Sequence, residues 1–250
     1  MRPALLLLCA LFILLRGGAR LRLIALFTPA RVMDFVSRFQ PVIAQNLFTI
    51  AGFFGGLRTA FERYPGRLPP AFLIVSNHQS LADIPALAIA FSPFGLRYVA
   101  KKELAKGLPY ISPSLRMGRH ALISRTGDYR RGQESMRRLA TLAKEGICPV
   151  VFPEGTRSRD GRVKGFYAGA LRVMLENQPM PVLSVAVDGG YRIATVPRLL
   201  LHARGTCYRV RPLTLYPPPR GKREIVDLVQ VIEREIAAQV AAWRQRETLG

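Results

Sequence analysis

The chain has 250 residues, which is enough for one large domain with a packed core, or for one domain with a membrane-binding appendage. Its 37 Lys and Arg residues against 16 Asp and Glu residues give a formal net charge of +21 and imply an anionic partner. Because apolar residues make up 49% of the chain and the basic residues form no long runs, a lipid surface fits this balance better than nucleic acid does.

The cysteines indicate a reducing compartment. Cys9, Cys148 and Cys207 show no paired spacing, so we expect three free thiols. The sequence contains neither Cys-x-x-Cys nor His-Glu-x-x-His. We therefore expect no metal and no bound cofactor.

The first 62 residues predict helices that lie against a membrane. Residues 4–15 form an apolar run of twelve residues, which as a helix spans roughly 18 Å and is too short to cross a hydrocarbon core of about 30 Å. Arg16, Arg20 and Arg22 follow it, as expected for a flank that stays cytoplasmic, and a secretory signal peptide is the alternative. A second apolar stripe runs from residue 36 to residue 57 at helical spacing and contains Pro41, which predicts a kink or a fresh helix start.

The rest of the chain alternates short apolar runs with helical patterns. We predict strands at residues 72–76, 97–100, 121–124, 147–152 and 182–187, with helices at 83–91, 133–145 and 168–176 between them. This alternation predicts an α/β fold with a mixed, largely parallel sheet that helices cover on both faces. Residues 206–213 are expected to form an edge strand, and a final helix follows the prolines at 217–219.

Two domains follow from this pattern. Residues 1–62 form the N-terminal membrane-associated helices, and residues 63–250 form the α/β domain. We expect the N-terminal segment to be an interfacial or re-entrant anchor at the cytoplasmic face of the inner (cell) membrane. A helix that faces the protein core is the alternative for its second apolar stripe.

The strand predicted at residues 72–76 leads into a stretch that holds His78 and, five positions later, Asp83. Within one helix, five residues turn through about 500°, so the two side chains would point to different faces. If His78 lies in the turn and Asp83 in the first helical turn, the carboxylate can fix the imidazole and leave its second nitrogen free to take a proton from an alcohol. A helix-capping Asp83 beside a loop histidine is the alternative. His120 and His202 lack such a setting and are expected to be structural.

Two further stretches follow strands of the same predicted sheet. One comes after the strand at residues 147–152 and combines a carboxylate, a glycine, a hydroxyl and a guanidinium, in the order Glu154, Gly155, Thr156 and Arg157. These groups suit a cradle for phosphate or carboxylate, and an ordinary turn with an ion pair is the alternative. Arg125 follows the strand at residues 121–124. Because ligands bind outside the carboxyl ends of parallel strands, we expect these side chains to converge with His78 on one edge of the sheet.

Taken in order, these motifs resemble those of the glycerophospholipid acyltransferase family, typified by lysophosphatidic acid acyltransferase. Residues 77–83 are similar to the first motif, Asn-His-x4-Asp, residues 118–125 resemble the second, and residues 152–158 match the third. The runs at 100–104 and 166–170 also resemble family sequences, and the likeness covers roughly residues 65–187. In the weaker fourth motif, at 181–186, Ser184 stands where the family usually has a proline.

The resemblance implies a membrane-bound enzyme that moves a fatty acyl group from acyl-CoA or acyl-carrier protein to the free hydroxyl of 1-acyl-glycerol-3-phosphate, giving phosphatidic acid. It implies that His78 and Asp83 are catalytic. The acceptor-binding residues that it implies are Arg125, Glu154, Gly155, Thr156 and Arg157. The expected partners are the acyl donor, the lysolipid and an anionic membrane surface, without nucleic acid.

Two alternatives stay open. Ser184 motivates transfer to another lysolipid, such as a lysophospholipid or a lyso-ornithine lipid. The charge of +21 motivates a non-enzymatic protein that binds an anionic membrane or nucleic acid, with an affinity that falls steeply with salt.

Overall fold

The computed structural model of the chain describes residues 2–124 and 129–248. Its helices are α1 (Arg2–Phe27), α2 (Val32–Gly55), α3 (Asp83–Ala90), α4 (Ile111–Met117), α5 (Tyr129–Thr141), α6 (Gly169–Asn177), α7 (Val196–His202) and α8 (Gly221–Thr248), with short 3₁₀ segments η1 (Pro29–Arg31), η2 (Lys102–Ala105), η3 (Leu142–Glu145) and η4 (Gly190–Ile193). Its strands are β1 (Arg58–Phe61), β2 (Leu73–Ser76), β3 (Gly95–Lys101), β4 (Ala121–Ile123), β5 (Ile147–Val151), β6 (Val182–Asp188) and β7 (Cys207–Tyr216).

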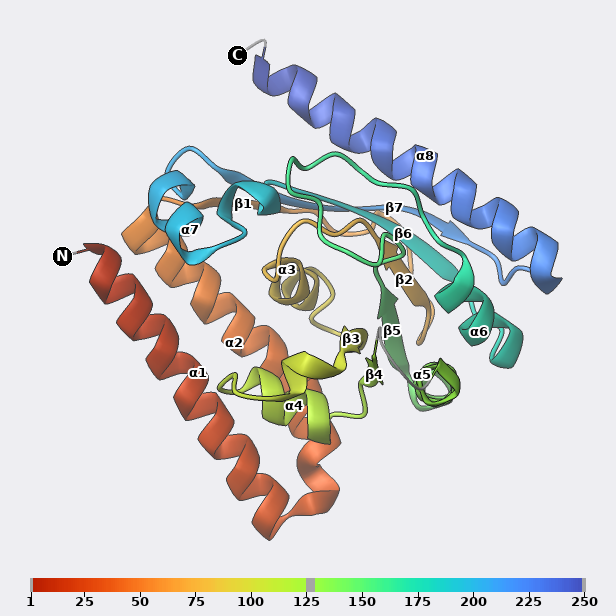
Figure 1. Ribbon diagram of the computed structural model, residues 1–250, viewed down its shortest axis with the longest axis horizontal. Coiled ribbons are helices and arrows are strands. Elements are labelled where there is room, and N and C mark those ends of the chain that lie inside the picture. Colours follow the sequence, from red (N-terminus) through yellow and green to blue (C-terminus); the bar gives the residue numbers. More distant parts are fainter. Residues whose placement is uncertain (1, 125–128, 249–250) are drawn as a thin grey trace.

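Among the described residues, these strands form one sheet in the order β1-β7-β6-β2-β5-β3-β4. Neighbouring strands are parallel except for β6 and β7, which are antiparallel. The sheet is therefore mixed and largely parallel, as the sequence predicts. Helices cover both of its faces (Figure 1), which explains why β2 and β6 are buried along their whole length.

Each face of the sheet carries its own hydrophobic core, because successive side chains of a strand point to opposite faces. Along β6, Leu183, Val185 and Val187 pack on the face covered by α2 and α3. Val182 and Ala186 pack on the face covered by α5, α6 and α8. The helix expected at 133–145 lies here, as α5 and η3.

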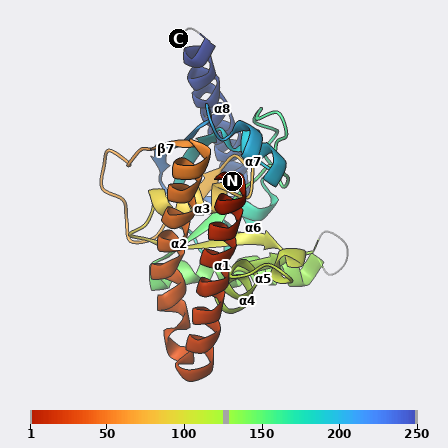
Figure 2. The ribbon, with the colours of Figure 1, turned by 90° about the vertical axis from the view of Figure 1, so that its left-hand side faces the viewer.

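The N-terminal segment is an antiparallel pair of long helices that extends beyond the sheet (Figure 2). The helix predicted at residues 4–15 is in fact the 26-residue α1, so the expectation that it is too short to cross a membrane is wrong. It spans about 39 Å and, among the described residues, is the helix whose length and apolar composition would allow it to cross a membrane.

The helix α1 passes through Gly17 and Gly18 without a break because both glycines pack against neighbouring elements. A Cβ atom at Gly17 would lie 2.5 Å from Ile43 of α2, and one at Gly18 would lie 2.8 Å from the backbone nitrogen of Tyr110. The helix α2 likewise continues through Pro41, which excludes a fresh helix start there.

The strand β7 is not the edge strand that its sequence predicts, since β1 pairs with its outer side. The short β1 is mostly exposed and carries little apolar signal, which is why the pattern of residues misses it. The division at residue 62 stays a prediction. In the structure, β1 joins the sheet although it precedes that boundary.

Candidate active site

The loop after β2 is fixed to the end of β6 by one asparagine. The side-chain amide of Asn77 donates to the carbonyl of Val187 at 2.9 Å, and its carbonyl oxygen accepts from the Val187 N–H at 2.9 Å. Asn77 is buried, so these two bonds also satisfy polar groups that water cannot reach. The next residue, His78, therefore leaves the sheet in a fixed direction.

His78 and Asp83 meet as the sequence predicts. Asp83 begins α3, and its Oδ2 lies 2.6 Å from Nδ1 of His78. The same oxygen accepts the backbone N–H groups of Gln79 at 2.6 Å and Ser80 at 2.9 Å, so the chain doubles back around a fully buried carboxylate. Because an ionised carboxylate only accepts, Nδ1 carries the proton and Nε2 is left as the basic nitrogen. The imidazole is 15% exposed, which leaves it accessible.

The loop after β5 packs against His78 from the other side. The ring of Phe152 stacks on the imidazole, with ring centroids 4.2 Å apart. The N–H of Ser158 donates to the carbonyl of His78 at 2.7 Å. The first and third motifs are thus held together at the carboxyl ends of β2 and β5, the edge where ligands bind in parallel sheets.

Glu154 is hydrogen-bonded to the backbone of His78. Its carboxyl group accepts the N–H of His78 at 2.8 Å and the N–H of Lys164 at 3.3 Å. Burial raises the pKa of Glu154 to about 7, and these two backbone donors offset part of the effect. Its predicted contact with a substrate stays a prediction, whereas its hydrogen bond to the backbone of His78 is visible in the structure.

The other predicted acceptor-binding residues lie on the exposed rim of the same loop. Gly155 adopts the left-handed conformation, with φ of 64°, and turns the chain after β5. Thr156 and Arg157 follow it, and both are exposed to solvent. Arg125 lies outside the described residues.

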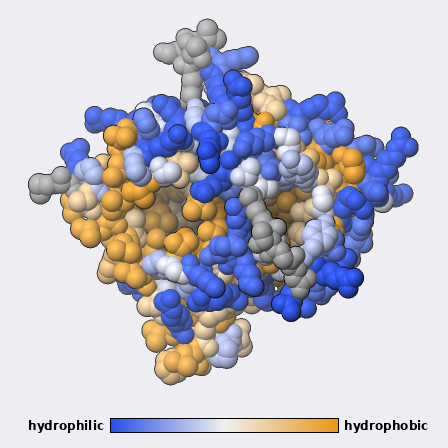
Figure 3. Space-filling view, viewed as in Figure 1, coloured by the Kyte–Doolittle hydropathy of each residue, from blue (hydrophilic) through white to orange (hydrophobic). Residues whose placement is uncertain are grey.

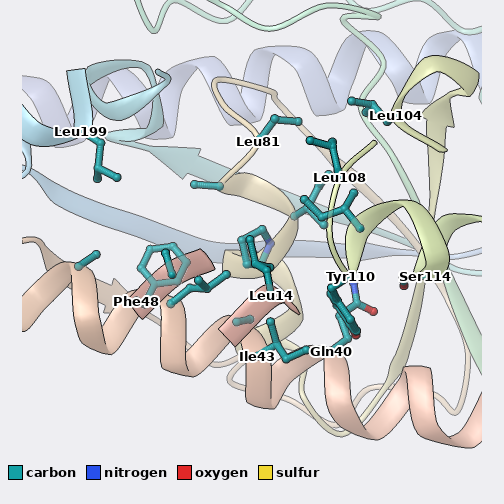
Figure 4. A pocket seen from close by; sticks show the side chains of 18 of the residues that line it. Leu14, Gln40, Ile43, Phe48, Leu81, Leu104, Leu108, Tyr110, Ser114 and Leu199 are labelled. Carbon is teal, nitrogen blue, oxygen red and sulfur yellow. The ribbon is translucent and has the colours of Figure 1, made fainter. Parts of the chain in front are cut away.

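An apolar pocket of about 330 Å³ lies beside the loop between β2 and α3, which carries His78 (Figure 4). Leu81 and Ala82, between the two catalytic candidates, line it together with apolar side chains of α1, α2, α3 and α4. Gln40 of α2 is the unexpected member, since its sequence position lies off the apolar stripe but its side chain is buried in the lining. His120 also lines the pocket, and its Nδ1 accepts the N–H of Tyr98 at 3.0 Å. Burial, helped by the charge of Arg97, lowers the pKa of His120 to about 3, in keeping with a structural role.

Two groups of residues at this site give no signal in the sequence, because they come from distant elements. The Tyr208 hydroxyl, on β7, donates to Oδ1 of Asp83. Arg244 of α8 pairs with Asp188 at 2.8 Å, and Asp188 accepts a hydrogen bond from the side chain of Gln79, the residue after His78, at 3.0 Å. A lone tyrosine in a strand and a lone arginine in a helix are common, and only the fold brings them here.

Ser184 points away from the pocket. Its hydroxyl donates to Glu235 of α8 and accepts the N–H of Thr214 at 3.0 Å, on the sheet face opposite the pocket side chains of α2 and α3. The departure from the fourth motif therefore has a structural partner in this chain.

The fold and the site are those of an α/β enzyme. An accessible imidazole is held by a buried carboxylate at the edge of the sheet. Residues 64–188, which are half of the 250 residues, match the model of the family described as Acyltransferase. The chain belongs to this acyltransferase family.

Named relatives agree with this assignment. The 1-acyl-sn-glycerol-3-phosphate acyltransferase of Limnanthes douglasii is 29% identical over 150 residues, which cover 59% of this chain and 49% of that protein. The chloroplastic 1-acyl-sn-glycerol-3-phosphate acyltransferase LPAT1 of Arabidopsis thaliana is 35% identical over 112 residues, which cover 45% of this chain and 30% of that protein. The chain thus spans about half the length, or less, of these relatives.

One solved structure is similar over almost the whole chain. The crystal structure of PlsC, the 1-acyl-sn-glycerophosphate (LPA) acyltransferase of Thermotoga maritima, matches with a TM-score of 0.66 over 98% of each chain. At 21% sequence identity, this match shows a common fold.

Proposed function

We propose that this chain is a membrane-associated O-acyltransferase that moves a fatty acyl group from a thioester of coenzyme A or acyl-carrier protein to the free hydroxyl of 1-acyl-glycerol-3-phosphate, giving phosphatidic acid. The observation that carries the proposal is the 2.6 Å contact between His78 and the buried Asp83, next to an apolar pocket. The names of the relatives support the choice of acceptor.

The reaction follows from two groups of the site, the basic Nε2 of His78 and the carboxylate of Asp83. Nε2 of His78 takes the proton of the acceptor hydroxyl while the oxygen forms a bond to the thioester carbonyl carbon. Asp83 stabilises the imidazolium that results. The tetrahedral intermediate then expels the thiolate, the carbon–sulfur bond breaks, and the thiolate recovers the proton from His78. No acyl-enzyme forms, and no oxidant or metal is needed for the balance.

The acceptor and the acyl chain bind on two sides of His78. Thr156 and Arg157, with Arg125 from outside the described residues, bind the phosphate of the lysolipid, since a guanidinium makes paired hydrogen bonds to phosphate oxygens. The apolar pocket takes a fatty acyl chain, because its lining offers few polar groups. The lining includes Leu81, three residues after the base, so the pocket lies next to the reacting groups.

The outer face of the N-terminal helices supports membrane association. Hydrophobic residues gather over the region of α1 and α2 (Figure 3). The exposed members on α1 are Leu5, Leu7, Leu8, Leu11, Phe12, Leu15, Leu23, Leu26 and Phe27. An apolar surface of this extent is unusual on a protein that lives in water alone, and it suits the interface of a bilayer. We expect the cytoplasmic face, where acyl donors are available.

The proposal is tested by an assay that crosses several lysolipids with acyl-CoA and acyl-carrier protein donors. The wild type should form phosphatidic acid, and His78→Ala should lose at least a thousandfold in kcat while it keeps its melting temperature. The matched control is His202→Ala, at the end of α7, which should keep wild-type turnover. Wild-type turnover in His78→Ala would reject the assignment of the base.

The alternatives are outcomes of the same experiments. If another lysolipid is the better acceptor by a wide margin, the proposed acceptor is wrong and the chemistry stands. Ser184, which motivates this alternative, bonds Glu235 of α8 and is not among the residues that line the pocket. Binding to anionic vesicles or nucleic acid without any product from a thioester would favour the non-enzymatic reading.

A further inference from the structure

The second carboxylate oxygen of Asp83 has its own partner. Whereas Oδ2 accepts from His78, Gln79 and Ser80, Oδ1 faces β7 and accepts the hydroxyl of Tyr208. Both residues are fully buried. The carboxylate is thus held at both ends, and the Tyr208 contact bridges 125 positions of sequence.

The phenol cannot turn away from Asp83. Its ring packs edge-on against Phe48 of α2, with centroids 5.3 Å apart, and against Phe61 of β1 at 6.4 Å. The backbone of Gly190 covers the bond from the third side, because a Cβ atom there would lie 2.9 Å from both Asp83 Oδ1 and the Tyr208 oxygen. The side-chain hydroxyl of Ser80 is a second hydrogen-bond partner of the phenol, and Asp83 Oδ1 is the acceptor of its proton.

The direction of the hydrogen bond is fixed by charge. An ionised carboxylate can only accept, so the phenol must be protonated to pair with it. Burial and the neighbouring negative charge of Asp83 raise the pKa of Tyr208 well above its usual range, which keeps the proton on the phenol. Tyr208 therefore donates to Asp83 throughout the working pH range and takes no part in proton transfer.

We propose that Tyr208 is a positioning residue for the acyl transfer, which acts by holding Asp83 and by sharing its negative charge. This inference rests on the proposed function. Fixing Oδ1 aims Oδ2 at the imidazole and keeps Nε2 directed at the acceptor hydroxyl. Sharing the charge weakens the attraction between Asp83 and the imidazolium, so the strength of this pair depends on the Tyr208 hydroxyl.

The test compares Tyr208→Phe with Tyr216→Phe. The control lies on the same strand, and its hydroxyl also bonds a carboxylate, Glu235 at 3.1 Å, on the face away from the pocket. We expect Tyr208→Phe to lower kcat about tenfold with unchanged KM values for donor and acceptor, and to move the acidic limb of the kcat/KM profile to higher pH. Tyr216→Phe should keep the wild-type kcat and profile.

Other titratable groups near the cluster remain in both variants. Glu154 approaches from the loop after β5, and Asp188 from the end of β6. Their contributions to the pH profile are present in the wild type, in Tyr208→Phe and in Tyr216→Phe alike. A shift of the limb seen only in Tyr208→Phe therefore reports the lost hydroxyl.

A second variant covers the case in which Tyr208→Phe does not fold. Replacement of Tyr208 by 3-fluorotyrosine keeps the ring and makes the hydroxyl a stronger donor, so the acidic limb should move to lower pH. Wild-type kcat and an unmoved limb would overturn the inference, as would a loss of kcat with an unmoved limb, which marks a purely structural role. An inactive wild type would overturn the proposed function and this inference with it, whereas an active wild type with an unchanged Tyr208→Phe overturns the inference alone.

Discussion

Glu154→Gln tests how one buried carboxyl group shapes the pH dependence of stability. Glu154 is 3% exposed, and burial raises its pKa from 4.5 to about 7. Because its pKa is higher in the folded than in the unfolded chain, the folded state binds more protons between about pH 4.5 and pH 7. The stability from this group is fully present below pH 4.5 and is lost as the pH rises through 7.

The size of the effect follows from the two pKa values. The difference between 4.5 and about 7 corresponds to an upper limit of about 3 kcal/mol of unfolding free energy. Residues 155–157 of the same loop are exposed, so the loop can relax and admit water when Glu154 ionises, which offsets part of this cost. We therefore expect the wild type to lose about 1–2 kcal/mol between pH 5 and pH 8 through this group.

The assay is denaturant unfolding of the detergent-solubilised protein at both pH values. Glu154→Gln removes the titration, so its loss of stability between pH 5 and pH 8 should be smaller than that of the wild type by about 1–2 kcal/mol. Glu176→Gln, which removes an exposed carboxyl group on α6, controls for the loss of a charge. If the wild type and Glu154→Gln lose equal stability over this range, the reasoning about the buried carboxyl is refuted.

Three further changes probe the packing of the site, the pocket and the anchor. Gly190→Ala places a methyl group 2.9 Å from Asp83 Oδ1 and should lower kcat at least tenfold. The control is Gly169→Ala, whose added methyl group meets nothing within 4 Å and which should keep the wild-type kcat. Equal kcat values for the two variants would contradict the close packing at Gly190. Gln40→Leu replaces the polar side chain that α2 contributes to the pocket lining by an apolar one and should lower the KM of a long saturated donor, measured on purified protein; an unchanged KM would show that the acyl chain does not reach this part of the pocket. Phe12→Asp, at a side chain that is 62% exposed on α1, should reduce co-sedimentation with anionic vesicles several-fold; unaltered binding would show that this face does not enter the lipid.

The contact between His78 and Asp83 could be predicted from the sequence because its geometry is local. His78 and Asp83 are five residues apart, and a strand end followed by a helix start permits one way for the chain to double back. The convergence of the loops after β2 and β5 follows from the rule that parallel strands share a carboxyl edge. Buried apolar runs likewise predicted most strands to within a residue or two.

The N-terminal helix shows where the local pattern failed. The apolar run ends at Leu15, and Gly17 and Gly18 have low helix propensity, so the sequence predicts an early end. The helix continues to Phe27 because these glycines allow α2 and the Tyr110 backbone to approach closely. Packing energy between elements outweighs a propensity difference of about 1 kcal/mol per glycine.

The sequence by itself determined most of the strands, the helices between them, the His78–Asp83 pair and the family, but not β1, α4 or α7. Only the tertiary structure decided that Tyr208 closes the far side of Asp83, that Glu154 supports the backbone of His78, and that Ser184 faces α8. The physical reason is that local spacing and hydrophobic period govern the first set, whereas the second depends on side chains that the sheet brings together from distant positions. Such contacts leave no pattern in a single sequence, because each residue looks ordinary until its partner is known.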